Sequence, residues 1–142
     1  MSEWKSVLVG VDGSRGSRRA LIWAAAEAAD HGAELIVLQA WERTLLPMIG
    51  SGSVPSADLE ESEGTPDDLI RIIKEELGEN PPVIAQPRVK QGRAAEVLIE
   101  ESKGVDLLVV GTRGRGGFAG LLLGSVSQHV AAYAQCPVTV VR

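Results

Sequence analysis

Three glycines and a serine near the end of the chain have the types and spacing that could bind a phosphate. Gly111 and Gly114 are separated by two residues, nine more precede Gly124, and Ser125 follows directly. A phosphate approaches several main-chain N–H groups closely only where no Cβ obstructs it. A helix starting at Gly124 and Ser125 would add unpaired N–H donors and the positive end of its dipole. The spacing therefore predicts an anion-binding loop between a strand and a helix.

The charges around this loop also favour an anion. The chain has a formal net charge of −5, yet residues 111–135 contain Arg113 and Arg115 and no acid. Overall acidity argues against nucleic-acid binding, which needs a basic face.

The single cysteine, Cys136, suits a reducing compartment, and no apolar run approaches the ~18 residues of a membrane span. With no apolar signal-type run in residues 1–5, we expect a cytoplasmic protein without a membrane partner.

Short apolar runs alternate with helical patterns along the chain. Strands are predicted at 7–11, 35–38, 83–89, 107–110 and 138–141, and helices at about 14–30, 66–77, 94–102 and from 125 to before Pro137. Continuous apolar runs predict strands covered on both faces, and hence a doubly wound α/β sheet. Residues 43–66, rich in Gly, Ser, Pro and acids, predict a long mobile loop within one domain spanning 1–142.

The Gly-x2-Gly-x9-Gly-Ser pattern resembles the nucleotide motif of the ATP-binding universal stress proteins. The first strand running into Val11-Asp12-Gly13-Ser14, and the ending at 136–141, resemble the same family. The resemblance implies a five-stranded parallel sheet of order 3-2-1-4-5 with helices on both faces. It places ATP where the first and fourth strands end, the usual ligand site of such a sheet. Independently, the prolines at 81, 82 and 87 favour an edge position for the third strand.

Carried over position by position, the resemblance implies a set of nucleotide-binding residues. The glycines and serines would contact ribose or phosphates, and three apolar residues (Val11, Ala40 and Val110) would frame adenine and ribose. Asp12 would lie near the phosphates and help to hold Mg²⁺, or else act only as the N-cap of the first helix. The two arginines are assigned from their charge alone. The full set is Val11, Asp12, Ala40, Val110, Gly111, Arg113, Gly114, Arg115, Gly124, Ser125, Val126 and Ser127.

Three functions remain open from the sequence. The first is an ATP-dependent stress-response module that another protein reads, and the second is a slow ATPase or an adenylate-forming enzyme. The third is a nucleotide-free structural dimer.

We assign no catalytic residue, because His129 lies one helical turn after Ser125 but no third group completes a triad. Residues 13–17 resemble a phosphate loop but lack its Lys, which favours a helix cap. The exposed apolar edge expected at 138–141 predicts a homodimer.

Overall fold

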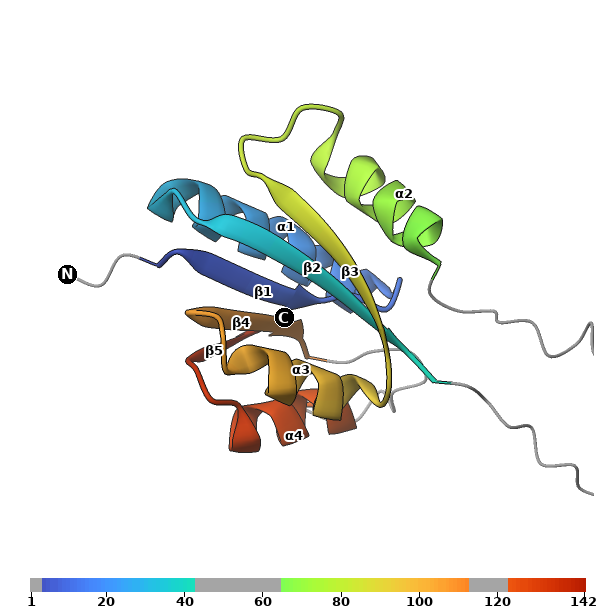
Figure 1. The fold of residues 1–142 in the computed structure, drawn as a ribbon, viewed down its shortest axis with the longest axis vertical. Helices are drawn as coiled ribbons and strands as arrows, with labels where there is room; N and C mark the ends of the chain where they lie inside the picture. Colours follow the sequence, from blue (N-terminus) through green and yellow to red (C-terminus); the bar gives the residue numbers. More distant parts are fainter. Residues whose placement is uncertain (1–3, 43–64, 113–122) are drawn as a thin grey trace, which may run out of the picture.

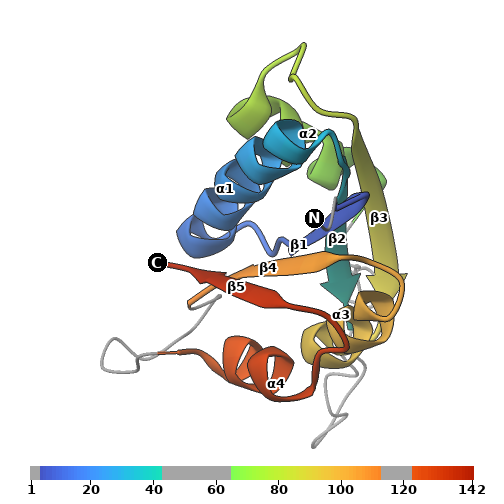
Figure 2. The same cartoon turned by 90° about the vertical axis from the view of Figure 1, so that its left-hand side faces the viewer.

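The residues that the structure describes form one parallel sheet with two helices on each face (Figures 1 and 2). This computed structural model describes residues 4–42, 65–112 and 123–142. The strand order is β3-β2-β1-β4-β5, which confirms the predicted topology. α1 and α2 cover one face, and α3 and α4 cover the other. In chain order the elements are β1 (Ser6–Gly10), α1 (Arg15–His31), β2 (Glu34–Trp41), α2 (Pro66–Leu77), β3 (Ala85–Gln91), α3 (Ala94–Ser102), β4 (Leu107–Gly111), α4 (Ser125–Tyr133) and β5 (Val138–Val141).

Alternate residues of the central strands supply two separate cores. Val7 and Val9 of β1 pack with α1 and α2, where Leu21 and Leu69 are fully buried. Leu8, between those valines, belongs to the second core with residues of α3 and α4. Side chains of a strand alternate between faces, so a strand buried on both faces must be apolar throughout. This explains the continuous apolar runs in the sequence.

The helices on the α1–α2 face begin at side-chain caps. The Ser14 hydroxyl accepts a hydrogen bond from Ser17 N at 3.3 Å, and α1 ends at Gly32, whose φ of 64° is left-handed. Thr65 caps α2 in the same way, and Pro66 is its first residue. A serine or threonine before a helix satisfies one of its unpaired N–H groups. The cap interpretation of residues 13–17 is confirmed, as are the predicted limits of α2.

Some strand limits differ from the prediction. β1 ends at Gly10, and β2 continues to Trp41, three residues beyond the predicted end. β3 begins at Ala85 because its register pairs Ala85 with Leu35 and continues without a break to the pair Gln91–Trp41. The extension of β2 is less apolar than its start, so composition alone did not reveal it. Of the predicted loop at 43–66, residues 43–64 lie outside the described residues.

The ends of the sheet are formed by β3 and β5. β3 carries Pro87, which confirms the edge position expected from its prolines. β5 pairs with β4 along Leu108–Val138 to Gly111–Val141, and all four of its residues are partly exposed. Within the described ranges, no helix is long and apolar enough to cross a membrane.

Candidate functional site

A pocket opens at the carboxyl edge of the sheet, at the ends of β1 and β4. Its empty space, including the part open to solvent, is about 540 Å³. The order β3-β2-β1-β4-β5 reverses direction between β1 and β4, where doubly wound sheets usually bind ligands. The lining consists of Gly10, Val11, Asp12, Ser17, Leu38, Ala40, Ala94, Leu98, Val110, Gly111, Val126 and Ser127.

The pocket brings together most of the predicted site residues that the structure describes. Gly124 and Ser125 are not among the lining but start α4, immediately before two residues that are. Arg113, Gly114 and Arg115 lie outside the described residues. The predicted residues in the lining are Val11, Asp12, Ala40, Val110, Gly111, Val126 and Ser127.

Five lining residues were not predicted. Leu98 and Ala94 come from α3, Leu38 from β2, Ser17 from α1 and Gly10 from the end of β1. A Cβ added at Gly10 would lie 2.9 Å from Leu98 Cδ1, so the leucine occupies the space that the glycine leaves. A glycine ending an apolar strand was the available signal for such a close approach. The sequence contained no signal for which face of α3 would meet it.

Gly111 has a packing role as well as a place in the pocket. A Cβ there would lie 2.8 Å from the main-chain carbon and oxygen of Gly16, in the first turn of α1. Real Cβ atoms essentially never approach backbone this closely, so the end of β4 and the start of α1 require a glycine. The requirement comes from two elements meeting, and it would hold without any ligand.

Asp12 organises the turn between β1 and α1. Its Oδ1 accepts hydrogen bonds from both the main-chain N–H, at 2.9 Å, and the hydroxyl of Ser14. Its own N–H donates to Ser17 Oγ at 3.2 Å. The N-cap of α1 is Ser14, so the alternative that Asp12 is only this helix's N-cap is wrong. The carboxylate instead lies in a hydrogen-bonded turn at the mouth of the pocket.

Ser127 ties α4 to the end of β4. It is 3% exposed, and its hydroxyl donates a hydrogen bond to the Gly111 carbonyl. Gly124 N–H donates to the Thr112 carbonyl at 2.5 Å, a second link between these elements. A hydroxyl has one donor and two acceptor positions, so the Ser127 oxygen could accept a bond from a ligand but not donate one at the same time.

The helices beside the pocket start without a side-chain cap. Arg93, at the start of α3, makes no capping bond, and Gly124, at the start of α4, has no side chain. The first residue of α3, Ala94, and two first-turn residues of α4 line the pocket. A helix N-terminus presents unpaired N–H groups and partial positive charge, which together favour an anion. The site therefore combines apolar walls with two positive helix ends.

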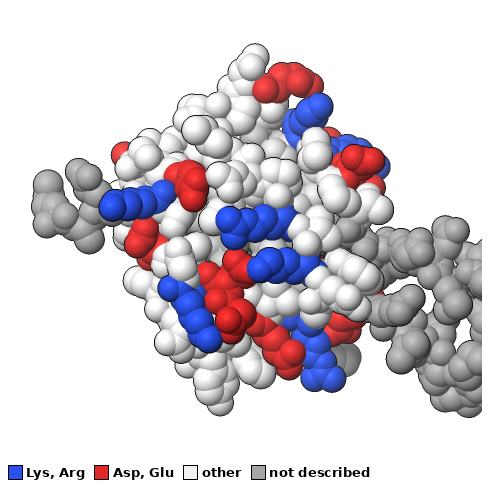
Figure 3. Space-filling model, viewed as in Figure 1, with Lys and Arg blue, Asp and Glu red and all other residues white. Residues whose placement is uncertain are grey.

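Other candidate groups lie outside this lining. Cys136 precedes β5 at the amino edge of the sheet, and burial, with a smaller effect of Asp106, raises the pKa of its thiol. His129 packs its ring on Tyr133, with centroids 5.1 Å apart. Among the residues that the structure describes, no three His, Cys, Asp or Glu side chains gather as a metal site. The face in Figure 3 intersperses Lys and Arg with Asp and Glu. Among the described residues visible there, the basic side chains form no continuous patch.

Known proteins are similar to this chain in sequence and in fold. Residues 3–142 match the universal stress protein family. A universal stress protein of Mycolicibacterium smegmatis is 41% identical over 96% of this chain, and one of Thermus aquaticus is 36% identical over 98%. The chain spans 45% of the first relative, about half of several others, and 99% of the second.

Solved structures of universal stress proteins have the same fold as this chain. The chain matches universal stress protein UspA from Lactobacillus plantarum with a TM-score of 0.81 and 22% identity, over all of both chains. It matches a universal stress protein in complex with cAMP with a TM-score of 0.70 and 29% identity, over 99% of this chain and 98% of the other. With this fold, this site and these relatives, the chain belongs to the universal stress protein family.

Proposed function

We propose that this protein binds ATP in the pocket at the β1–β4 switch point and acts as a nucleotide-dependent regulatory module of the stress response. The observation that carries the proposal is the pocket itself, where apolar walls meet two helix N-termini without side-chain caps. A nucleotide needs both, since its base is largely apolar on its faces and its phosphates are anionic. The complex of a 29% identical relative with cAMP supports a nucleotide ligand.

The described residues divide the pocket into two parts. Leu38, Ala40, Leu98 and Val110 offer the apolar surface for the base. The first turn of α4, from Ser125, would receive the phosphates together with Gly114 and the two arginines predicted from the sequence. This division gives the base shape complementarity and the phosphates backbone donors.

Asp12 would help to hold Mg²⁺ against the phosphates. A carboxylate is a hard oxygen ligand, and Mg²⁺ often binds through one or two carboxylates plus substrate phosphates. The turn hydrogen bonds from Ser14 hold its Oδ1 at the pocket mouth. Asp12 is the one ionisable side chain in the described lining. We therefore propose a binding role that sets a conformation, rather than rapid hydrolysis.

The direct test is to denature the purified protein and identify released nucleotide by mass, then to titrate nucleotide-free protein with ATP by calorimetry. Gly124→Val places a branched side chain at the start of α4 and should abolish ATP binding. Gly104→Val is the matched control, because a Cβ there meets nothing within 4 Å and Gly104 lies outside the pocket. Equal ATP affinity in both folded variants would place the nucleotide elsewhere.

We further propose a homodimer through β5. This strand ends the sheet, is apolar apart from Thr139, and is partly exposed along its length. A second copy could pair with its free edge about a two-fold axis, giving a surface that a protein partner in the cytoplasm could read. Light scattering at micromolar concentration tests this, with Val140→Pro expected to weaken the dimer. A monomer with and without ATP would contradict it.

A further inference from the structure

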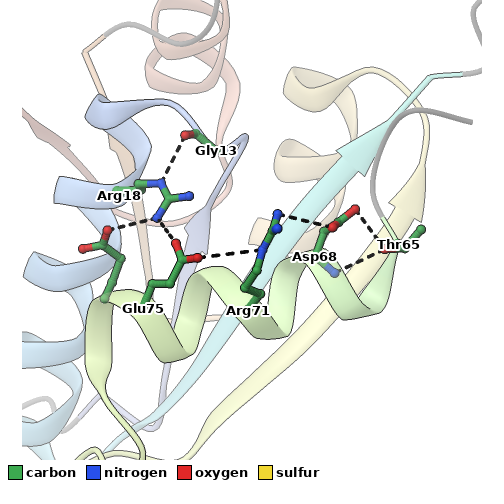
Figure 4. Close-up of polar contacts among 7 residues, drawn as sticks. Gly13, Arg18, Thr65, Asp68, Arg71 and Glu75 are labelled. Carbon is green, nitrogen blue, oxygen red and sulfur yellow. Dashed lines mark hydrogen bonds and ion pairs between the residues drawn. The ribbon is translucent and has the colours of Figure 1, made fainter.

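An ionic network joins the start of α1 to the last turns of α2. Arg18, in the second turn of α1, places Nη1 2.8 Å from Glu75 Oε2 and 3.1 Å from Glu76 Oε1 (Figure 4). The Arg18 side chain is 26% exposed and the Glu76 side chain 23%. Solvent screens a partly buried ion pair less than a fully exposed one. The two carboxylates therefore define where this guanidinium lies.

The same guanidinium reaches the turn at the pocket mouth. Arg18 Nε donates to the Gly13 carbonyl at 3.2 Å, and Gly13 directly follows Asp12. Gly13 has a φ of 84°, in the left-handed region that favours glycine. Because glycine has no Cβ, its own conformational preference does little to fix the turn. Bonds to Ser14 and Ser17 hold Asp12 from within the turn and the helix start. Arg18 holds the intervening carbonyl from outside it.

The geometry of arginine links these two sets of contacts. Its guanidinium is planar and rigid, so the direction of Nε–H is set once Nη1 is held. The hydrogen bonds that Arg18 donates, first to Glu75 and then to Glu76, raise the pKa of Arg18, and the bond that Glu75 accepts lowers the pKa of its carboxyl. Because two carboxylates balance this one cation, Arg18 adds no net positive field that would attract phosphate. Arg18 could therefore affect the pocket only by fixing the position of the turn.

We infer that Arg18 is a positioning residue of the nucleotide site, holding the Asp12–Ser14 turn in place and coupling it to α2. Arg18 is not part of the pocket lining, whereas Asp12 is. The inference rests on the proposed function, because it assigns Arg18 a role in nucleotide affinity. Movement of α2 would then change that affinity without contact between α2 and the nucleotide.

The test compares four variants with the wild-type protein. Arg18→Gln removes the contact, Arg18→Lys keeps only the charge, and Glu75→Gln with Glu76→Gln removes the fixed partners. Arg71→Gln is the matched control, because Arg71 pairs with Asp68 and Glu75 on α2 but does not contact the turn (Figure 4). ATP affinity with Mg²⁺ is measured by calorimetry. Exchange of the Asp12 and Ser14 amide hydrogens is measured by NMR without nucleotide.

We expect ATP affinity to fall about tenfold in Arg18→Gln, Arg18→Lys and the double Glu variant, the lower end for residues that orient a ligand. The control should stay within about twofold of wild type, the scale of exposed ion pairs. Exchange at the turn should accelerate in the first three variants, while thermal melting confirms that they fold. If Arg18→Gln is too unstable to measure, the double Glu variant on α2 decides the outcome.

Two results would overturn the inference while leaving the proposed function in place. One is ATP binding by wild type with unchanged affinity in Arg18→Gln, and the other is full recovery in Arg18→Lys, which would mean that charge alone acts. Failure of wild type to bind ATP would instead overturn the proposed function, and the inference with it.

Discussion

The two faces of the sheet are built differently. On the α1–α2 face, both helices begin at side-chain caps, Ser14 and Thr65, and Arg18 joins them through ion pairs. On the other face, α3 and α4 begin at Arg93 and Gly124 without such caps, and the pocket lies at their N-termini. A Ser or Thr cap stabilises a helix by about 1 kcal/mol relative to alanine and by roughly a few tenths of a kcal/mol relative to glycine. In the described part of the molecule, side-chain caps are therefore missing at the two helix N-termini whose N–H groups could serve a ligand.

The largest expected effect distinguishes the two cores. Leu69→Ala on α2 and Leu98→Ala on α3 each truncate a buried leucine and should cost about 2–5 kcal/mol of unfolding free energy. Of these two leucines only Leu98 lines the pocket, so ATP affinity should fall more in Leu98→Ala than in Leu69→Ala, which can reach the site only through α2 and Arg18. Urea denaturation and calorimetry measure the two quantities. Equal losses of ATP affinity in the two folded variants would mean that contact of Leu98 with the nucleotide makes no difference.

The contact between Gly111 and α1 should produce the next largest effect. Gly111→Ala places a Cβ 2.8 Å from the Gly16 backbone and should cost about 1–3 kcal/mol, the usual range for overpacking. Gly104→Ala has open space around its Cβ and should change stability by no more than about 0.5 kcal/mol. Chemical denaturation of both variants without nucleotide makes the comparison. Equal free energies of unfolding for the Gly111→Ala and Gly104→Ala variants would show that β4 and α1 can move apart without loss of stability.

Adding a side-chain cap to α4 would make its N-terminus resemble those of α1 and α2. Gly124→Asp should stabilise α4, by up to about 1 kcal/mol, because an aspartate at the N-cap accepts from the first turn and complements the dipole. The same carboxylate should repel the phosphates of ATP. We therefore expect a higher Tm without nucleotide together with lower ATP affinity in calorimetry. A variant that gains stability and keeps its affinity would show that this N-terminus does not face the ligand.

The smallest expected effect concerns acid stability on the α1–α2 face. Arg18 lowers the pKa of the Glu75 carboxyl, so this carboxyl stabilises the fold above its unfolded pKa. That contribution is lost as the pH falls through the lowered pKa of the folded state. Glu75→Gln should therefore reduce the difference in Tm between neutral and acidic pH, with the wild type more stable than the variant at neutral pH. Parallel Tm changes of both proteins with pH would contradict the role of this pair.

Local chemistry in the sequence predicted the helix ends well. The helix predicted at 66–77 starts at Thr65 and Pro66, and the helix predicted at 14–30 ends at Gly32, because caps act within a few residues of the helix end. The strand order came from the resemblance to universal stress proteins, with independent support from prolines only for the edge position of β3. The start of β3 was missed because register depends on β2, which is distant in the chain.

The sequence alone was enough to predict the α/β class, the order of helices and strands, and a glycine-rich stretch suited to an anion. Only the tertiary structure decided that Leu98 fills the space over Gly10, that Gly111 contacts Gly16, and that Arg18 reaches both α2 and the turn after Asp12. Strand alternation and helix caps follow from neighbouring residues, so a linear pattern can reveal them. The contacts of Leu98 with Gly10, of Gly111 with Gly16 and of Arg18 with α2 join elements far apart in the chain, and these partners become neighbours only when the helices pack on the sheet.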